Sequence, residues 1–166
     1  ASFAGVETAR ACPFCSAPTL TLTEQFGKAE VALLVQYVDA EEAKGNKLGS
    51  TKYLIVQTLR LPAATEAKVL ADAKKKYAKG ETVTLPRQFG GKKGNLCLLL
   101  GSEVQDEKVS SIEWASPMEV TETVVNYMVQ APSLDMPAEK RLAYFIKFLE
   151  YSDQALANDA YSEFAN

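Results

Sequence analysis

The chain has 166 residues, of which 47% are hydrophobic and 23% are charged. These values fit one globular domain, or one domain with a small appendage. The net charge of −3 creates no overall positive field for nucleic acid or an anionic membrane. The absence of histidine excludes Ser/His and Cys/His catalysis and removes the commonest transition-metal ligand. Three cysteines are too few for a Cys₄ zinc site, so we expect no metal, no cofactor and no nucleic-acid partner.

The expected location of this chain is extracytoplasmic, either periplasmic or secreted. Its apolar runs, such as Val31 to Val35, have the length of strands and are far shorter than the roughly 20 residues of a membrane span. The sequence opens with Ala1-Ser2-Phe3-Ala4 and no Met, as cleavage of a secretory signal peptide can leave it, although a cloning choice would look the same. Cysteines near that start suit an oxidising compartment.

The first 29 residues are expected to form an arm and a short helix. Residues 1–21 are small, polar and proline-containing, which predicts an irregular arm. Thr21-Leu22-Thr23-Glu24 matches a capping box, in which the Thr hydroxyl and the Glu carboxylate each satisfy a free backbone N–H at a helix start. A helix is therefore expected from there to about Lys28.

Two strands are predicted over residues 31–38 and 52–61, where β-branched and aromatic residues alternate with others. The charged, Gly-containing connector between them predicts that they pair as a hairpin. The alternation predicts these inward-facing side chains: Val31, Leu33, Val35 and Tyr37 in the first strand, and Tyr53, Ile55, Leu59 and Leu61 in the second.

A helix is expected after Pro62, capped by Thr65 and ended by Gly80. Its predicted apolar side consists of Val69, Leu70, Ala73 and Tyr77. Lysines surround this stripe, and with basic residues further along they could form a face for an anionic partner, although such a run is more typical of a solvated surface. The basic residues are Lys74, Lys75, Lys76, Lys79, Arg87, Lys92 and Lys93.

Three more strands are predicted, over residues 82–89, 96–104 and 109–114, with a Gly-rich turn at 90–95. Pro86 cannot donate to a ladder, so its strand should be an edge or carry a bulge. A helix then opens at Thr121, turns Val124, Val125 and Met128 inward, and ends at Ala131. The fold class predicted is α+β: residues 30–131 form a five-stranded antiparallel OB-like β-barrel with flanking helices.

Residues 132–166 are expected to form a C-terminal helical hairpin. A proline-containing linker over 132–137 precedes two amphipathic segments, 138–151 and 153–164. Their predicted inward residues are Leu142, Phe145, Ile146 and Leu149 in the first segment, and Leu156, Ala160 and Phe164 in the second.

The order of short helix, five-stranded barrel and helix, with cysteines ahead of the first helix and in the fourth strand, resembles the netrin-like module shared with tissue inhibitors of metalloproteinases. The resemblance covers residues 12–131 and is carried by the segments 29–35, 53–56 and 95–100. It implies an OB-like barrel. Those inhibitors place a free N-terminal Cys amine on the target metal, whereas the first cysteine here is Cys12, so inhibition of metalloproteinases is not implied.

The C-terminal segment resembles one HEAT-type helical repeat, in which Asp153, Asn158-Asp159-Ala160 and Phe164 would belong to the second helix. A solenoid needs about three or more repeats to bury its core. Two alternatives follow: a longer precursor continues beyond Asn166, or the hairpin packs back on the barrel.

The Cys12-Pro13-Phe14-Cys15 run resembles thioredoxin and glutaredoxin sites, in which Cys12 would be the attacking thiolate and Cys15 the resolving thiol. In those folds the run opens a long helix, whereas Pro18 interrupts the segment here. A structural role is therefore favoured: Cys12 or Cys15 pairs with Cys97, or the two pair with each other. Cys97 is equally well explained as a small buried residue.

The function favoured by the sequence is a non-catalytic exported interaction or structural module that docks to a protein partner or a larger assembly. Aromatic residues on both tail helices are the candidate partner-binding residues, although helical spacing is also typical of a core. The alternative is a thiol-disulfide oxidoreductase, and a small ligand at the barrel mouth is a third hypothesis. The candidate residues are Phe145, Phe148, Tyr151, Tyr161 and Phe164.

Overall fold

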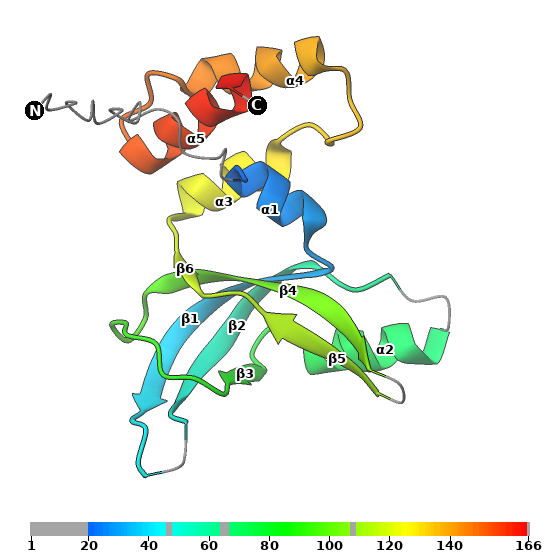
Figure 1. Cartoon of the computed structure of the whole chain (residues 1–166), viewed down its shortest axis with the longest axis vertical. Helices are drawn as coiled ribbons and strands as arrows, with labels where there is room; N and C mark the ends of the chain where they lie inside the picture. The colour runs from blue at the N-terminus through cyan, green and yellow to red at the C-terminus, as the bar shows by residue number, and fades with distance from the viewer. Residues whose placement is uncertain (1–19, 46–47, 64–66, 107–108, 166) are drawn as a thin grey trace, which may run out of the picture.

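The structure is a computed structural model that describes residues 20–45, 48–63, 67–106 and 109–165. An antiparallel sheet curls into a half-barrel, and helices α1 and α3 lie against one side of it (Figure 1). Helices α4 and α5 form a further layer on α1 and α3, whereas α2 lies on the other side of the sheet (Figure 1). The predicted α+β class with an antiparallel sheet is confirmed.

The main sheet has the strand order β3-β2-β1-β4-β5, and every neighbouring pair is antiparallel. The predicted hairpin of the first two strands is therefore confirmed. A short strand that the sequence did not indicate, β6, pairs with β4 outside this order. The strands are β1 (Val31–Glu41), β2 (Ser50–Arg60), β3 (Thr82–Leu85), β4 (Leu96–Asp106), β5 (Val109–Trp114) and β6 (Met118–Glu119).

Helices α1 and α3 begin where their predicted caps place them. Thr65, predicted to cap α2, lies outside the described residues, and α2 ends at Lys76, before Gly80. Thr21 and Glu24 form the predicted capping box at α1, and the Thr121 side chain accepts a hydrogen bond from the Val124 N–H at the start of α3. The helices are α1 (Leu22–Lys28), α2 (Ala67–Lys76), α3 (Glu122–Gln130), α4 (Ala138–Phe145) and α5 (Gln154–Ala165), with the 3₁₀ helix η1 (Ile146–Phe148) between the last two.

Two hydrophobic cores lie on opposite faces of the sheet, because alternate residues of a strand point to opposite sides. The inner core, inside the curl, contains Val31, Leu33, Val35, Tyr53, Ile55, Tyr77, Val83, Leu85, Cys97 and Leu99. The helix-side core contains Ala29, Ala32, Leu34, Leu98, Leu100, Val124, Val125, Tyr127, Met128, Phe145, Leu156 and Ala160. A sheet that is covered on both faces explains the continuous apolar runs in β1 and β4.

The prediction for Leu59 was wrong, because β2 contains irregularities that strict alternation does not anticipate. The β1–β2 register shifts between Ala32 and Leu33 and again between Leu34 and Val35. An extra residue on one strand reverses the faces of the residues beyond it. Leu59 consequently packs against the helix-side core, while Tyr53 and Ile55 belong to the inner core as predicted.

Three helical positions predicted to face inward are exposed: Val69, Ile146 and, near the end of α5, Phe164. Val69 is exposed because α2 contributes only its later residue Ala73, together with Tyr77 just beyond its end, to the inner core. Ile146 is exposed because α4 tightens at that residue into the 3₁₀ turn η1. Side chains four residues apart no longer share one side in such a turn.

Gly101 lies opposite Trp114 in the β4–β5 ladder, where the sheet has no room for a side chain. A Cβ on Gly101 would lie 2.5 Å from the Ile112 Cγ2 and 3.0 Å from two Trp114 ring carbons. We expect Gly101→Ala to lower the free energy of unfolding by about 1–3 kcal/mol through overpacking. Urea denaturation measures this change. Gly90→Ala is the control, because a Cβ there has nothing within 4 Å; equal losses for the two variants would contradict the prediction.

Candidate functional site

The cysteines predicted to form a redox site or a disulfide cannot all be placed. Cys12 and Cys15 lie outside the described residues, so the redox and pairing hypotheses stay predictions. Cys97 is buried in the inner core and has no disulfide partner among the described residues. Burial, and then the negative charge of Glu119, raise the pKa of the Cys97 thiol. A thiol held protonated is a weak nucleophile, so Cys97 is suited to packing rather than to exchange chemistry.

The five aromatic residues predicted to bind a partner are divided between core and surface. Phe145 is 0% exposed, so its assignment to a docking surface was wrong: the ring fills the helix-side core. Phe148 is half-buried against the same core, and the exposed Tyr151 contacts its ring. Tyr161 and Phe164 are 70% and 41% exposed on α5. Helical spacing alone could not separate these two groups of residues.

The open-edge groove lies between the two unpaired edges of the half-barrel, β3 and β5. It has a volume of about 640 Å³ at one end, where Leu85, Phe89, Ile112 and Trp114 supply apolar surface. A second hollow of about 360 Å³ continues it along the edges, between Thr82 to Thr84 of β3 and Ser111 to Trp114 of β5. The same two strands therefore line both parts of the groove.

Backbone hydrogen-bonding groups face this groove from β3. In an antiparallel pair, residues alternate between exchanging hydrogen bonds with the neighbouring strand and pointing their N–H and C=O groups away from it. The Ile55 N–H donates to the Glu81 C=O, and Val83 lies opposite Tyr53 two residues along. Val83 and Leu85 thus bond to β2, whereas the backbone groups of Thr82 and Thr84 point toward the free edge.

The same alternation applies to β5. The Ala115 N–H donates to the Leu100 C=O, and Glu113 lies opposite Ser102 in the ladder. Glu113 and Ser111 thus bond to β4, and the backbone groups of Ile112 and Trp114 point toward the free edge. Each wall of the groove accordingly presents backbone donors and acceptors, and the half-buried Ile112 and Trp114 side chains turn toward the inner core.

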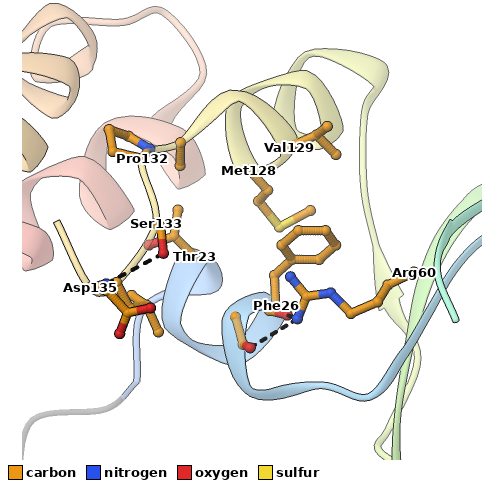
Figure 2. A pocket seen from close by; sticks show the side chains of 11 residues that line it. Thr23, Phe26, Arg60, Met128, Val129, Pro132, Ser133 and Asp135 are labelled. Atoms are coloured by element: carbon orange, nitrogen blue, oxygen red, sulfur yellow. Dashed lines mark hydrogen bonds between the residues drawn. The ribbon is translucent and has the colours of Figure 1, made fainter. Parts of the chain in front are cut away.

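A smaller cavity of about 400 Å³ lies between α1, α3 and the segment that follows α3 (Figure 2). The Arg60 guanidinium lies on one side of it, 4.6 Å from the centre of the Phe26 ring. Arg60 Nη1 donates to the backbone carbonyls of Phe26, Gly27 and Ala29, at 2.6, 2.9 and 2.9 Å. This side chain therefore caps the C-terminal end of α1, and its polar contacts serve the fold.

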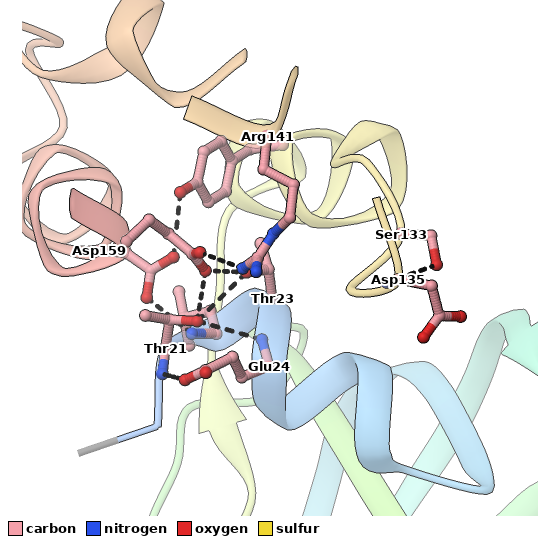
Figure 3. Close-up of polar contacts among 10 residues, drawn as sticks. Thr21, Thr23, Glu24, Ser133, Asp135, Arg141 and Asp159 are labelled. Carbon is pink, nitrogen blue, oxygen red and sulfur yellow. Dashed lines mark hydrogen bonds and ion pairs between the residues drawn. The ribbon is translucent and has the colours of Figure 1, made fainter. Parts of the chain in front are cut away.

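The carboxylate cluster joins α5 to α1, α3 and α4 (Figure 3). Glu163 accepts hydrogen bonds from the Thr21 and Thr23 hydroxyls and pairs with Arg141 at 2.6 Å. Asp159 accepts from the Leu22 N–H at 2.6 Å and from the Tyr127 hydroxyl at 3.0 Å. The carboxylate cluster comprises seven residues: Thr21, Thr23, Glu24, Tyr127, Arg141, Asp159 and Glu163.

The cluster fixes the C-terminal hairpin, which we define as α4, η1 and α5, on the rest of the chain. Both Asp159 and Glu163 are buried, and sequence reasoning missed them as a pair of functional groups. Their spacing of four residues on one helix face was the available signal. The hairpin packs on α3 and the helix-side core of the sheet, as one of the two alternatives predicted. The other alternative, a precursor that continues beyond Asn166, stays a prediction.

Comparison of the chain with family models, curated proteins and solved structures finds no match. No helix among the described residues is long and apolar enough to cross a membrane. The part of the chain that the structure describes contains no group of three or more Cys, Asp or Glu residues arranged to hold a metal ion. The candidate sites are the open-edge groove and the carboxylate cluster, on the geometry given above.

Proposed function

We propose that this chain is a non-catalytic interaction module that binds an extended segment of a protein partner in the open-edge groove. The observation that carries the proposal is the pair of unpaired strand edges that line one groove, which is apolar at one end. Free edges of this kind are templates for an added strand. The finer proposal that the half-barrel is OB-like agrees with this function, because the OB-fold is a partly open barrel that binds its ligands on the sheet and adjacent loops.

Strand direction supports an added strand rather than direct closure of the barrel. β2 is antiparallel to both β1 and β3, and β4 is antiparallel to both β1 and β5. It follows that β3 and β5 run in the same direction. A single strand between them, running the opposite way, would be antiparallel to both neighbours. The backbone groups of Thr82, Thr84, Ile112 and Trp114 would then gain partners across both edges.

The chemistry of the groove indicates the side chains that such a segment would carry. Alternate residues of a bound strand would point inward, toward Leu85, Phe89 and Trp114, and should be apolar. Arg87 is exposed at one end of the groove and Lys76 at the other. Two cations at the ends favour acidic residues in the partner segment, although Glu113 opposes part of this charge.

The test starts from a phage-displayed library of random dodecapeptides selected on the whole chain. We expect selected peptides to alternate apolar residues and to bind with Kd values below about 100 µM, as measured by fluorescence anisotropy. Thr84→Pro removes a backbone donor from the free edge and leaves the bonds between β2 and β3 in place. It is expected to weaken binding at least about tenfold, a loss of about 1.4 kcal/mol.

Matched variants distinguish binding in this groove from binding elsewhere on the surface. Thr84→Val keeps the backbone N–H and should bind as the unchanged chain does. Thr82→Pro repeats the test at a second position, in case Thr84→Pro does not fold. The double variant Tyr161→Ser, Phe164→Ser tests the exposed face of α5. The proposal is contradicted if the library yields no peptide below that Kd, if Thr84→Pro and Thr82→Pro bind normally, or if only the α5 variant loses binding.

A further inference from the structure

Among the described residues, the carboxylate cluster brings three carboxyl groups and one guanidinium together, and two of the carboxyl groups, those of Asp159 and Glu163, are buried. Three carboxyl groups meet there, those of Glu24, Asp159 and Glu163, and the guanidinium of Arg141 faces them. Arg141 pairs with Glu163, whose side chain is 1% exposed. The two oxygens of Asp159 accept hydrogen bonds from Leu22 and Tyr127, which are neutral donors.

The groups that face Asp159 come from every helix packed around it. Glu24 approaches from α1, the Tyr127 hydroxyl from α3, and Glu163 from α5 itself. On α4, Arg141 is bound to Glu163, and the Tyr144 hydroxyl donates to the Tyr127 C=O at 2.8 Å. Two of these neighbours are acidic, so an ionised Asp159 adds a charge where like charges already lie. The docked hairpin therefore favours a protonated Asp159.

We propose that the C-terminal hairpin is a pH-dependent latch, which holds α1 and α3 more tightly in acid than at neutral or alkaline pH because Asp159 takes up a proton on docking. The latch covers apolar surface: Phe145, Leu156 and Ala160 of the hairpin pack in the helix-side core with Tyr127 and Met128 of α3. Each opening exposes this surface. The pH would thereby set how often the surface is accessible.

The direction of the pH effect follows from linkage. Burial is the main cause that raises the pKa of the Asp159 carboxyl above its ordinary value of 3.8. The hydrogen bonds from Leu22 and Tyr127 lower this pKa, and the charges of Glu163 and Glu24 raise it. The docked state thus binds the proton more tightly than the undocked state. The added stability is complete below 3.8 and is lost as the pH rises through the docked-state pKa.

Hydrogen exchange of the whole chain, followed by mass spectrometry, tests the latch. Asp159→Asn keeps an oxygen for the Leu22 N–H and removes the charge. At each pH between about 4.5 and 8, the exchange rate of the α3 and α5 segments is divided by the rate in Asp159→Asn, so that the intrinsic pH dependence of exchange cancels. We expect this ratio to rise at least about fivefold over the range, since each unit of pKa elevation is worth a factor of about ten.

Three further measurements make the test specific. Asp72→Asn changes an exposed residue on α2. The exchange rate of the unchanged chain divided by that of Asp72→Asn should stay near one at every pH. The central strands β1 and β4 should keep their protection, because the latch opens without unfolding the sheet. Tyr127→Phe removes a hydrogen bond to the ionised carboxylate and should make the pH dependence of exchange steeper, which provides a second variant if Asp159→Asn does not fold.

The outcomes that overturn the latch are distinct from those that support it. A ratio that stays constant with pH would show that Asp159 does not couple docking to protonation. Faster exchange in Asp159→Asn than in the unchanged chain at every pH would show that the charge of Asp159 stabilises docking. Loss of protection in β1 and β4 together with α3 and α5 would show that the hairpin does not open separately. Each of these results contradicts the proposal.

Discussion

Replacing Phe145 with alanine is expected to lower the free energy of unfolding by about 3–5 kcal/mol. The ring is fully buried, with its centre 5.8 Å from that of Tyr127 and 5.3 Å from that of Tyr144. It packs with Leu156 between the hairpin and the helix-side core. Truncation removes this buried apolar surface and leaves a cavity between the hairpin and the helix-side core. Urea denaturation followed by circular dichroism measures the loss.

Phe164→Ala is the matched control for this prediction. It removes the same side chain from the same hairpin, but at a position that is 41% exposed. Substitutions on exposed surfaces usually change stability by no more than about 0.5 kcal/mol. If Phe164→Ala costs as much as Phe145→Ala, the division of the tail aromatics into core and surface residues is wrong.

Replacing Arg141 with methionine is expected to cost about 3 kcal/mol, because it leaves the buried Glu163 carboxylate without its cation. The two side chains form an ion pair at 2.6 Å. Thr21 and Thr23 would still donate to Glu163, but hydroxyls do not neutralise its charge. Thermal unfolding at neutral pH measures the effect as a lower Tm.

Two comparisons decide whether the loss comes from the uncompensated charge. Lys140→Met changes the exposed neighbour of Arg141 and should leave Tm nearly unchanged. Glu163→Gln in the Arg141→Met background removes the unpaired charge and should recover part of the loss, since neutral partners avoid most of the desolvation cost. Equal costs for Arg141→Met and Lys140→Met, or no recovery in the double variant, would show that the ion pair does not stabilise the hairpin.

Local patterns in the sequence predicted most of the elements. The capping box at Thr21 located α1, because its hydrogen bonds join residues three positions apart. The bounds predicted for β5, Val109 to Trp114, match the structure. Pro86 predicted that its strand, expected over residues 82–89, is an edge or carries a bulge; β3 is an edge strand, but it ends at Leu85, before the proline. These features depend on neighbours in the chain, so the sequence alone could reveal them.

Features that depend on contacts between residues far apart in the sequence could not be predicted from local patterns. Glu163 receives hydrogen bonds from Thr21 and Thr23, at the opposite end of the described chain. The faces of Leu59 and Ile146 depend on a shifted register and on a tightened turn. The groove exists because the curled sheet brings β3 and β5 near each other, and neither strand carries a motif that predicts this. Each of these features depends on the tertiary structure and not on neighbouring residues in the sequence.

The central position of β1 in the sheet determines when its two neighbouring strands become available during synthesis. Its first neighbour, β2, follows directly, but its second neighbour is β4, where Leu34 pairs with Leu98. Until β4 leaves the ribosome, one edge of the most apolar strand remains without a partner. Early hairpins of this kind are exposed to aggregation, and pairing across a long loop is slow. The nascent hairpin is therefore prone to aggregation over this interval, which ends when the centre of the sheet is formed.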